Sequence, residues 1–342
     1  MTEALPSRFG LWHCDSRHGA YGAAIFPAVI LPHPFLRQFL ALFLLVALSG
    51  SVLGAQAYII VDAKSGHVLE ERNSRQKRQV ASLTKVATAL VVLDWAESRN
   101  GDLTQVATIP PEAFAGGGEN HVGFQPGDTA TLRDLLYAAL VQSDNIAGFT
   151  LAHHVGQALQ GVVPSAGSPV ATFVSQMNAL ARNLKMERTR FSNPTGQDSN
   201  VKPVPHSTAA DMARLTRYAM GKAGFRFYVS QKERQISFNR GGAQREYLLK
   251  NTNELLGREG VDGVKTGRTA RAGDCLILSA QREAEVIKHD TTSTTIIPRH
   301  VIIVMLGSSN RFAEGSQLLN TGWQAFDQWT NTGRMVDPKK TL

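Results

Sequence analysis

The sequence predicts an α+β fold, with one mainly antiparallel sheet built from both ends of the chain and a helical subdomain inserted between them. Two observations support this prediction. Runs rich in β-formers lie near residues 58–71 and again between residues 236 and 306. Between them, from residue 82 to residue 221, apolar residues recur at helical spacing. The chain has 342 residues, of which 43% are apolar and 19% charged, so it can bury a full core.

The first part of the chain has the features of a secretory signal. Arg37 precedes an apolar run from Phe39 to Leu48, and small residues follow as far as Ala55-Gln56-Ala57. A charged residue, a short apolar run and an A-x-A-like end are typical of a signal peptide. The run is short for a membrane span. We therefore expect residues 1–57 to be a leader that is cleaved after Ala57, or else retained as an N-terminal anchor.

The remaining elements follow from periodicity and turn residues. Residues 58–62 and 67–71 are expected to pair as a hairpin. The predicted helices share an apolar stripe at helical spacing and cover residues 82–97, 131–141, 146–157, 171–186, 208–221 and 312–329. The further predicted strands are apolar runs at residues 106–109, 261–267, 275–280 and 301–306.

Two helix starts and one loop are predicted from local residue types. Thr131 and Asp134 resemble a capping box, and Ser207 or Thr208 is a candidate cap for the helix that follows. Residues 283–298 are polar and rich in threonine, so we expect a long mobile loop there. The catalytic domain is then residues 58–333, followed by a short tail, residues 334–342.

Charge and cysteine content exclude several classes of function. The net charge is +8, but no block of five basic residues and no nucleic-acid-binding motif occurs, so nucleic acid is not an expected partner. Cys14 and Cys275 belong to no C-x-x-C or His/Cys cluster. His153 and His154 are adjacent, so their side chains diverge on a helix, one expected on the surface and one in the core. We expect no metal and no cofactor, and the sequence leaves the oligomeric state open.

The first chemical motif is Ser82-Leu83-Thr84-Lys85, just ahead of the apolar run Val86–Leu93. If Ser82 opens a helix, Lys85 lies one turn further on the same face. The helix start also offers unpaired N–H groups to an anion. A hydroxyl, an amine and oxyanion donors are what a serine acyl-transfer enzyme needs. The same spacing at Ser74/Lys77 and Ser199/Lys202 lies in polar segments, and we interpret it as chance.

Two more motifs follow in order. Ser143-Asp144-Asn145 lies between two predicted helices, and Lys265-Thr266-Gly267 lies on a predicted strand. Each motif is weak alone, because Lys64-Ser65-Gly66 repeats the third one in a turn. The ordered triple, each in its expected context, is typical of penicillin-binding proteins and class A β-lactamases.

The residue types suggest a role for each catalytic group. Ser82 attacks a carbonyl carbon, and Lys85 is its base if burial and neighbouring cations such as Lys265 lower the pKa of Lys85. Ser143 passes a proton to the leaving amine. Asn145 holds the substrate amide and orients Lys85.

The third motif provides candidate substrate-binding residues. Lys265 adds positive potential near a substrate carboxylate, and Thr266 hydrogen-bonds that carboxylate. Gly267 lets a peptide pair against the edge of the strand. The backbone N–H groups of Ser82 and Arg268 are candidate oxyanion donors.

With these motifs, the chain from about Tyr58 to Trp329 resembles the D-alanyl-D-alanine carboxypeptidases, the low-molecular-mass penicillin-binding proteins. Further matching stretches are Asn193-Pro194-Thr195-Gly196, Gly260–Gly267, Ala272–Cys275, Arg311-Phe312, Leu318-Leu319 and Gly322-Trp323. The resemblance implies a β-lactamase/penicillin-binding-protein-like fold and an exported enzyme, periplasmic or facing the cell wall. It implies removal of the terminal D-Ala from peptidoglycan pentapeptide stems, acylation by β-lactams, and a role for Arg311 in binding the terminal carboxylate.

The chain also departs from the family pattern. Gln197 stands where family members often have leucine, and Asp144 stands where glycine is common. Because the chain ends at Leu342, we expect neither a C-terminal β-domain nor an anchoring helix. That length also resembles the D,D-endopeptidases of the same family, which cut peptidoglycan cross-links.

Three alternatives therefore stay open beside the carboxypeptidase. The first is the D,D-endopeptidase, and the second is a sensor that β-lactams acylate without turnover. The third, a class A β-lactamase, needs a carboxylate to activate the deacylating water. Between Ser143 and Lys265 the nearest candidate for that carboxylate is Glu187, and its surroundings do not match.

Overall fold

Two antiparallel sheets frame the part of the chain that the computed structural model describes, residues 54–99, 102–116, 118–162, 167–199, 201–289 and 293–342. These residues belong to one compact unit. The predicted leader up to residue 53 lies outside the described residues. No helix in the described ranges has both the length and the apolar character needed to cross a membrane.

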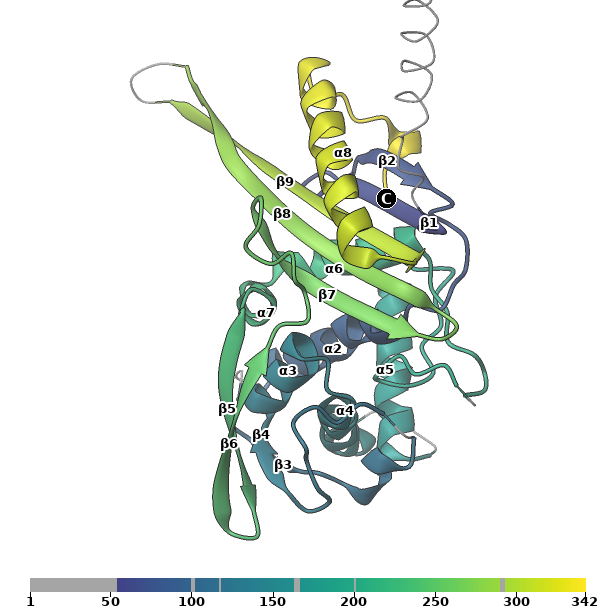
Figure 1. The fold of residues 1–342 in the computed structure, drawn as a ribbon, viewed down its shortest axis with the longest axis vertical. Helices are drawn as coiled ribbons and strands as arrows, with labels where there is room; N and C mark the ends of the chain where they lie inside the picture. The colour runs from purple at the N-terminus through teal and green to yellow at the C-terminus, as the bar shows by residue number, and fades with distance from the viewer. Residues whose placement is uncertain (1–53, 100–101, 117, 163–166, 200, 290–292) are drawn as a thin grey trace, which may run out of the picture. The chain divides into compact units, whose positions relative to one another are not determined.

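The larger sheet joins the two ends of the chain, as predicted. Its five strands run in the order β2-β1-β9-β8-β7, and every neighbouring pair is antiparallel. Their bounds are β1 Ala57–Asp62, β2 Val68–Arg72, β7 Val261–Thr269, β8 Gly273–Lys288 and β9 Thr294–Ser308. Where β1 pairs with β9, Ile59 lies opposite Val304. The predicted hairpin of β1 and β2 is present, and β7 is an edge strand of this sheet (Figure 1).

A second sheet differs from the single sheet that we expected. Its order is β3-β4-β5-β6, with bounds β3 Val106–Thr108, β4 Thr129–Thr131, β5 Glu233–Arg240 and β6 Ala243–Lys250. The sequence signal was weak for a physical reason. β4 has three residues, and most of β6 is exposed and charged, so neither strand forms an apolar run.

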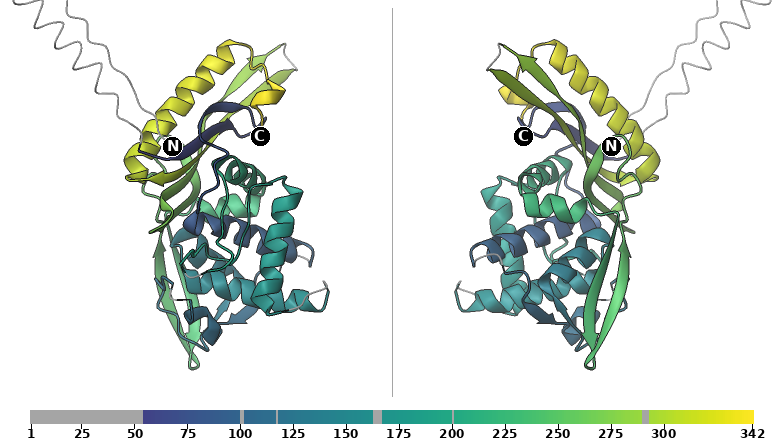
Figure 2. Two further views of the ribbon diagram at one scale, coloured as in Figure 1. Left: turned by 90° about the vertical axis from the view of Figure 1, so that its right-hand side faces the viewer. Right: turned by 90° about the vertical axis from the view of Figure 1, so that its left-hand side faces the viewer.

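The described residues contain seven α-helices. They are α2 Lys85–Glu97, α3 Leu132–Val141, α4 Asn145–Gln160, α5 Pro169–Asn183, α6 Ala209–Gly221, α7 Ala223–Val229 and α8 Arg311–Asn331. Of these, α6, α7 and α8 contact the five-stranded sheet. Short 3₁₀ helices are η1 Ala81–Thr84, η2 Pro111–Phe114 and η3 Pro338–Lys340. Figure 2 shows α8 on one side of the sheet and the cluster of the other helices on the opposite side.

The alternation of side chains along the strands produces two hydrophobic cores. Ile59 and Val61 of β1 pack with the helical cluster, whereas Ile60 packs with Leu318 and Trp323 of α8. Helix α2 lies inside the first core and is buried on nearly all sides. A helix buried all round is held rigidly, so the residues at its start keep a fixed position.

Two predicted helix starts are confirmed. Thr131 Oγ1 accepts a hydrogen bond from the backbone N–H of Asp134 at 3.1 Å, at the start of α3. Thr208 Oγ1 does the same for Asp211 at 3.0 Å, at the start of α6. Each bond satisfies one of the N–H groups that a helix start leaves unpaired.

The prediction of a long mobile loop at residues 283–298 is wrong. β8 continues to Lys288 and β9 begins at Thr294, with Val286 opposite Ile296. This outer half of the hairpin is largely exposed (Figure 1), so its polar composition reflects solvent contact and does not prevent strand pairing. Its threonine and isoleucine residues favour the extended backbone.

The residues just before the predicted cleavage point are part of the fold. Ala55 and Ala57 are buried, and the backbone N–H of Ala55 donates to Glu314 Oε2 at 2.6 Å. The N–H of Gln56 donates to the carbonyl of Leu306 at 3.0 Å. Cleavage after Ala57 stays a prediction, and it would remove these contacts. At the other end of the chain, Leu342 N donates to the carbonyl of Gly66 at 3.1 Å.

Candidate active site

Ser82 lies inside the 3₁₀ helix η1, which continues directly into α2. We had expected Ser82 to open the long helix itself. Instead it lies one turn before the first residue of α2. That residue is Lys85, and its Nζ lies 2.9 Å from Ser82 Oγ. Residues three apart in a 3₁₀ turn lie on the same side, so the predicted proximity of the two side chains is confirmed.

Lys85 is completely buried, and three acceptors surround its amine. Nζ hydrogen-bonds Ser82 Oγ, Asn145 Oδ1 at 2.5 Å and the carbonyl of Thr195 at 3.2 Å. Three acceptors match the three hydrogens of an ammonium group. Burial nevertheless lowers the pKa of Lys85 to about 7, against the opposing effect of Asp144 and Glu119. A large fraction of Lys85 is therefore neutral near pH 7.

The second motif forms the turn between α3 and α4. Ser143 adopts a φ of 68°, in the left-handed region that few non-glycine residues occupy. Asp144 caps α4, because its Oδ1 accepts from the N–H of Ala147 at 2.8 Å. Its Oδ2 accepts from the N–H of Val122 at 3.1 Å. Burial raises the pKa of Asp144. The aspartate that departs from the family pattern therefore ties α4 to the preceding loop.

The third motif lies on β7, beside η1. Lys265 and Thr266 are buried, and Lys265 Nζ donates to the carbonyl of Thr266 at 3.0 Å. Burial lowers the pKa of Lys265 well below its usual value, and the nearby Lys85 and Arg311 charges lower it further. Gly267 allows the strand to approach the nucleophile. A Cβ at this position would lie 2.9 Å from the backbone nitrogen of Ser82, so a larger residue would push β7 away from η1.

Two arginines flank the carboxylate of Asp274. Arg311 Nη1 donates to the carbonyl of Gly267 at 3.1 Å and lies 3.4 Å from Asp274 Oδ1. Arg268 Nε lies 3.5 Å from the same oxygen, while its side chain is 73% exposed. Arg311 therefore contacts the backbone of β7, and the guanidinium of Arg268 projects into solvent.

The nucleophile opens into a cavity of about 250 Å³. Its walls are formed by α4, the end of β7 and two loops, and the lining residues are Ser82, Gly116, Gly118, Glu119, Asn145, Thr195, Gly196, Gln197, Asp198, Ser199, Arg268, Thr269 and Ala270. We call this space the catalytic cavity. Lys265, Thr266 and Arg311 are not among the residues that line it.

The sequence analysis missed several residues of this cavity. Gln197 joins its two loops, because Nε2 donates to the carbonyl of Gly116 at 3.1 Å and Oε1 accepts from Thr195 Oγ1 at 3.4 Å. Asp198 Oδ2 accepts from Thr269 Oγ1 at 2.6 Å. Glu119 precedes Ser143, so it fell outside the interval in which we sought a carboxylate. Residues in irregular loops have no periodic spacing that could have identified them.

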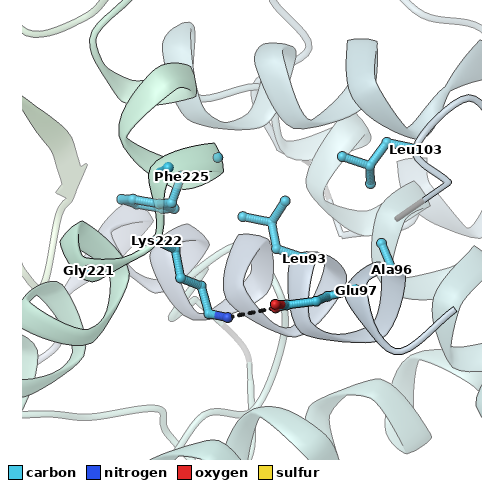
Figure 3. Close-up of a pocket in the computed structure, with 9 residues that line it drawn as sticks. Leu93, Ala96, Glu97, Leu103, Gly221, Lys222 and Phe225 are labelled. Atoms are coloured by element: carbon cyan, nitrogen blue, oxygen red, sulfur yellow. Dashed lines mark hydrogen bonds and ion pairs between the residues drawn. The ribbon is translucent and has the colours of Figure 1, made fainter. Parts of the chain in front are cut away.

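A larger cavity, of about 570 Å³, lies at the other end of α2 (Figure 3). Leu93, Leu103 and Phe225 line it, and Lys222 and Glu97 pair at its rim. Thirteen helical residues rise about 20 Å, so this cavity is far from Ser82. It contains no residue of the three motifs and is not the catalytic site.

A metal site was not expected, and no group of three or more His, Cys, Asp or Glu side chains in the described part of the chain could hold a metal ion. His153 and His154 are both half-buried, in place of the predicted division into one surface and one core residue. Both lie on α4, and the ring of His154 packs edge-on against Trp95 of α2.

The fold and the three motifs can now be compared with known proteins. The family model described as D-alanyl-D-alanine carboxypeptidase matches residues 47–289. The chain belongs to this family. The D-alanyl-D-alanine carboxypeptidase DacC of Escherichia coli strain K12 is 32% identical over 286 residues, which are 81% of this chain and 63% of that protein. The DacD enzyme of Salmonella typhimurium strain LT2 is 31% identical over 300 residues, 84% of this chain and 68% of that protein.

Solved structures share the fold. The DD-transpeptidase of Streptomyces K15 has a TM-score of 0.67 and 26% identity, and the match covers 81% of this chain and all of that one. Penicillin-binding protein D2 from Listeria monocytogenes, in its ampicillin-bound form, has a TM-score of 0.61 and covers 79% of this chain and 98% of that one. The predicted penicillin-binding-protein-like α+β fold is confirmed.

Proposed function

We propose that the protein is a serine-type D-alanyl-D-alanine carboxypeptidase that removes the terminal D-Ala from peptidoglycan pentapeptide stems. The observation that carries this proposal is the 2.9 Å contact between Ser82 Oγ and the buried amine of Lys85, whose pKa is lowered to about 7. A neutral amine in hydrogen-bond contact with a hydroxyl is a general base for a nucleophile. The names of the E. coli and Salmonella relatives support the same activity.

Acylation uses the groups around Ser82. Lys85 takes the proton from Ser82 Oγ as the oxygen attacks the carbonyl carbon of the penultimate D-Ala. The N–H groups of Ser82 and Arg268 face the oxyanion that forms. Ser143 passes the proton that Lys85 took up to the leaving nitrogen, the C–N bond breaks, free D-Ala departs, and Lys85 is neutral again. Asn145 holds the substrate amide and keeps Lys85 in place.

Deacylation returns the enzyme to its starting state. Lys85 takes a proton from a water molecule that attacks the ester carbon, and the ester C–O bond breaks. Lys85 returns that proton to Ser82 Oγ, and the shortened peptide leaves as a carboxylic acid. A β-lactam acylates the same oxygen by opening its ring, and its amine then stays attached to the acyl group.

Substrate binding is assigned to β7 and α8. Lys265, Thr266 and Arg311 recognise the terminal carboxylate, and Gly267 lets the peptide lie against the edge of β7. Burial, and then the charges of Lys85 and Arg311, lower the pKa of Lys265, so a bound carboxylate beside it would favour its charged form. We further propose that the protein is exported and acts on the cell wall, as the leader and the basic net charge suggest.

The direct test is the release of free D-Ala from a pentapeptide muropeptide, measured beside a Ser82→Ala variant. Release that disappears in the variant would support both the activity and the nucleophile. Folded protein that releases no D-Ala, but cuts cross-linked muropeptide dimers, would point to the endopeptidase. Acylation by a β-lactam without any release would point to the sensor, and rapid turnover of a chromogenic cephalosporin to the β-lactamase.

A further inference from the structure

We propose that the catalytic cavity recognises a zwitterionic side chain on the third residue of the stem peptide, with Glu119 binding its ammonium group and Arg268 its carboxylate. A side chain of this kind carries an amino group and a carboxylate on one carbon, as in diaminopimelate. The inference rests on the proposed function and names the substrate class that it takes.

The position of the cavity decides which part of the substrate enters it. The scissile carbonyl lies at Ser82 Oγ, and it divides the leaving D-Ala from the rest of the stem. The residues assigned to the D-Ala carboxylate, Lys265, Thr266 and Arg311, do not line the catalytic cavity. The cavity instead extends from Ser82 past Asn145 to the two loops. It is therefore on the acyl side, and the third residue is the next side chain after the penultimate D-Ala.

The size of the cavity fits one side chain. A volume of about 250 Å³ is smaller than the cavities of about 300–1,000 Å³ that enclose whole drug-sized ligands. The loops around it are fixed by hydrogen bonds, because Gln197 joins Gly116 to Thr195 and Asp198 holds Thr269. A small cavity with fixed walls selects among side chains by their charge and length.

Glu119 supplies the exposed carboxylate of the cavity, whereas the other lining carboxylate, Asp198, is buried and accepts from Thr269. The carbonyl of Glu119 accepts the N–H of Asn145 at 2.9 Å, so its backbone is fixed next to the catalytic turn. Its carboxylate is 66% exposed and lies 3.2 Å from His121 Nε2, which is itself exposed. A carboxylate with a fixed backbone and an exposed head is suited to binding an incoming ammonium group.

Arg268 supplies the positive charge. Its backbone is fixed in β7 opposite Asp274, while its exposed guanidinium makes only a long 3.5 Å contact to the Asp274 carboxylate. Glu119 and Arg268 do not pair with each other within the described residues. Glu119 and Arg268 are thus the two exposed charges of the cavity lining, and two opposite charges that do not neutralise each other are complementary to a ligand that carries both.

The proposal predicts an order of substrates. We would measure kcat/KM for D-Ala release from four pentapeptides that differ only at the third residue: meso-diaminopimelate, diaminopimelate amidated at its side-chain carboxylate, lysine and norleucine. The diaminopimelate peptide should be preferred over norleucine by about four- to 25-fold, since each of the two exposed charge pairs contributes roughly two- to fivefold. The amidated and lysine peptides should lie between the two.

Two charge-removing variants separate the two contacts. Glu119→Gln should reduce the preference for the three ammonium-bearing peptides over norleucine by about two- to fivefold. Arg268→Gln should remove the difference between diaminopimelate and its amide, and Arg268→Lys should restore part of that difference. Glu112→Gln and Arg245→Gln remove the same charges at exposed positions outside the cavity, and they should keep the wild-type ratios.

Several outcomes would overturn the proposal. Equal kcat/KM for all four peptides in the wild type would overturn it and leave the carboxypeptidase intact. An equal fall on all four peptides in Glu119→Gln, with slower loss of a bound β-lactam, would assign Glu119 to water activation in place of recognition. No D-Ala from any peptide would overturn this inference together with the proposed function. Stoichiometric β-lactam acylation of each variant establishes that it is folded.

Discussion

Two lysines beside the two ends of α2 have opposite chemistry. Lys85, at the start of the helix, is completely buried, and burial lowers its pKa to about 7. Lys222 packs against the other end, where its Nζ lies 2.8 Å from Asp94 Oδ1 and 3.0 Å from Glu97 Oε2. The hydrogen bond to Asp94 raises the pKa of Lys222. A lysine amine that is buried without a carboxylate in hydrogen-bond contact can act as a base near neutral pH. A lysine amine that is bonded to a carboxylate stays charged.

The largest difference in activity between the two lysines is expected when each is changed to arginine. Arginine keeps the positive charge but cannot lose its proton near neutral pH. Lys85→Arg should therefore lower kcat/KM for D-Ala release by about a thousandfold, as expected for loss of a general base. The matched Lys222→Arg variant keeps its ion pairs and should retain wild-type activity. A Lys85→Arg enzyme with a tenth of the wild-type rate would show that Lys85 is not the base.

The pH dependence should report the lowered pKa of Lys85. The base works when it is neutral, so kcat/KM should rise with pH and level off above the pKa of about 7. Below that pH it should fall about tenfold per unit. The pH profile of kcat/KM for Lys222→Ala should have the same acid limb as that of the wild type. A limb near pH 10, where an ordinary lysine titrates, would contradict the effect of burial.

A smaller effect should come from Asp144, which opposes the lowering of the pKa of Lys85. Asp144→Asn removes this negative charge, so the acid limb of the pH profile should move to lower pH. The amide oxygen can still accept the N–H of Ala147, but the bond to Val122 is at risk. We expect a loss of about 1 kcal/mol in the free energy of unfolding, measured in urea. An unmoved limb would mean that Asp144 is protonated in the native enzyme.

The smallest effect is expected at the Lys222 ion pairs. Lys222→Ala removes contacts to two partly exposed carboxylates, so the free energy of unfolding should fall by about 0.5–1 kcal/mol. The difference from wild type should shrink in 1 M salt, where exposed charges are screened. D-Ala release should not change. A loss of activity here would mean that the far end of α2 is coupled to Ser82.

Local features of the sequence predicted most elements of the fold. The spacing of Ser82 and Lys85, the caps at Thr131 and Thr208, and the strands from both chain ends all agree with the structure. These features depend on neighbours within one turn or on a continuous apolar run. In the second sheet only β3 was predicted as a strand; β4 was missed because it has three residues, and β6 and the outer half of β8–β9 were missed because they are exposed and lack such runs.

The environment of the site was predicted less well, because it depends on contacts distant in sequence. We expected burial and Lys265 to lower the pKa of Lys85. Burial is the main cause, and the charges that act on Lys85 are those of Asp144 and Glu119, which raise its pKa. The repulsion between the two lysines acts on Lys265 instead, because the charge of Lys85 lowers the pKa of Lys265. Local spacing could not reveal the bond from Val122 to Asp144 or the link from Gln197 to Gly116.

The pairing of β1 with β9 also governs when the chain can fold. A ribosome completes β1 early and β9 late, and β1 lies between β2 and the central strand β9. Until the last strand has been synthesised, the first has a partner on one side only. Pairings between such distant segments form slowly, because a long loop must close first. The five-stranded sheet therefore cannot be completed until β9 has been synthesised.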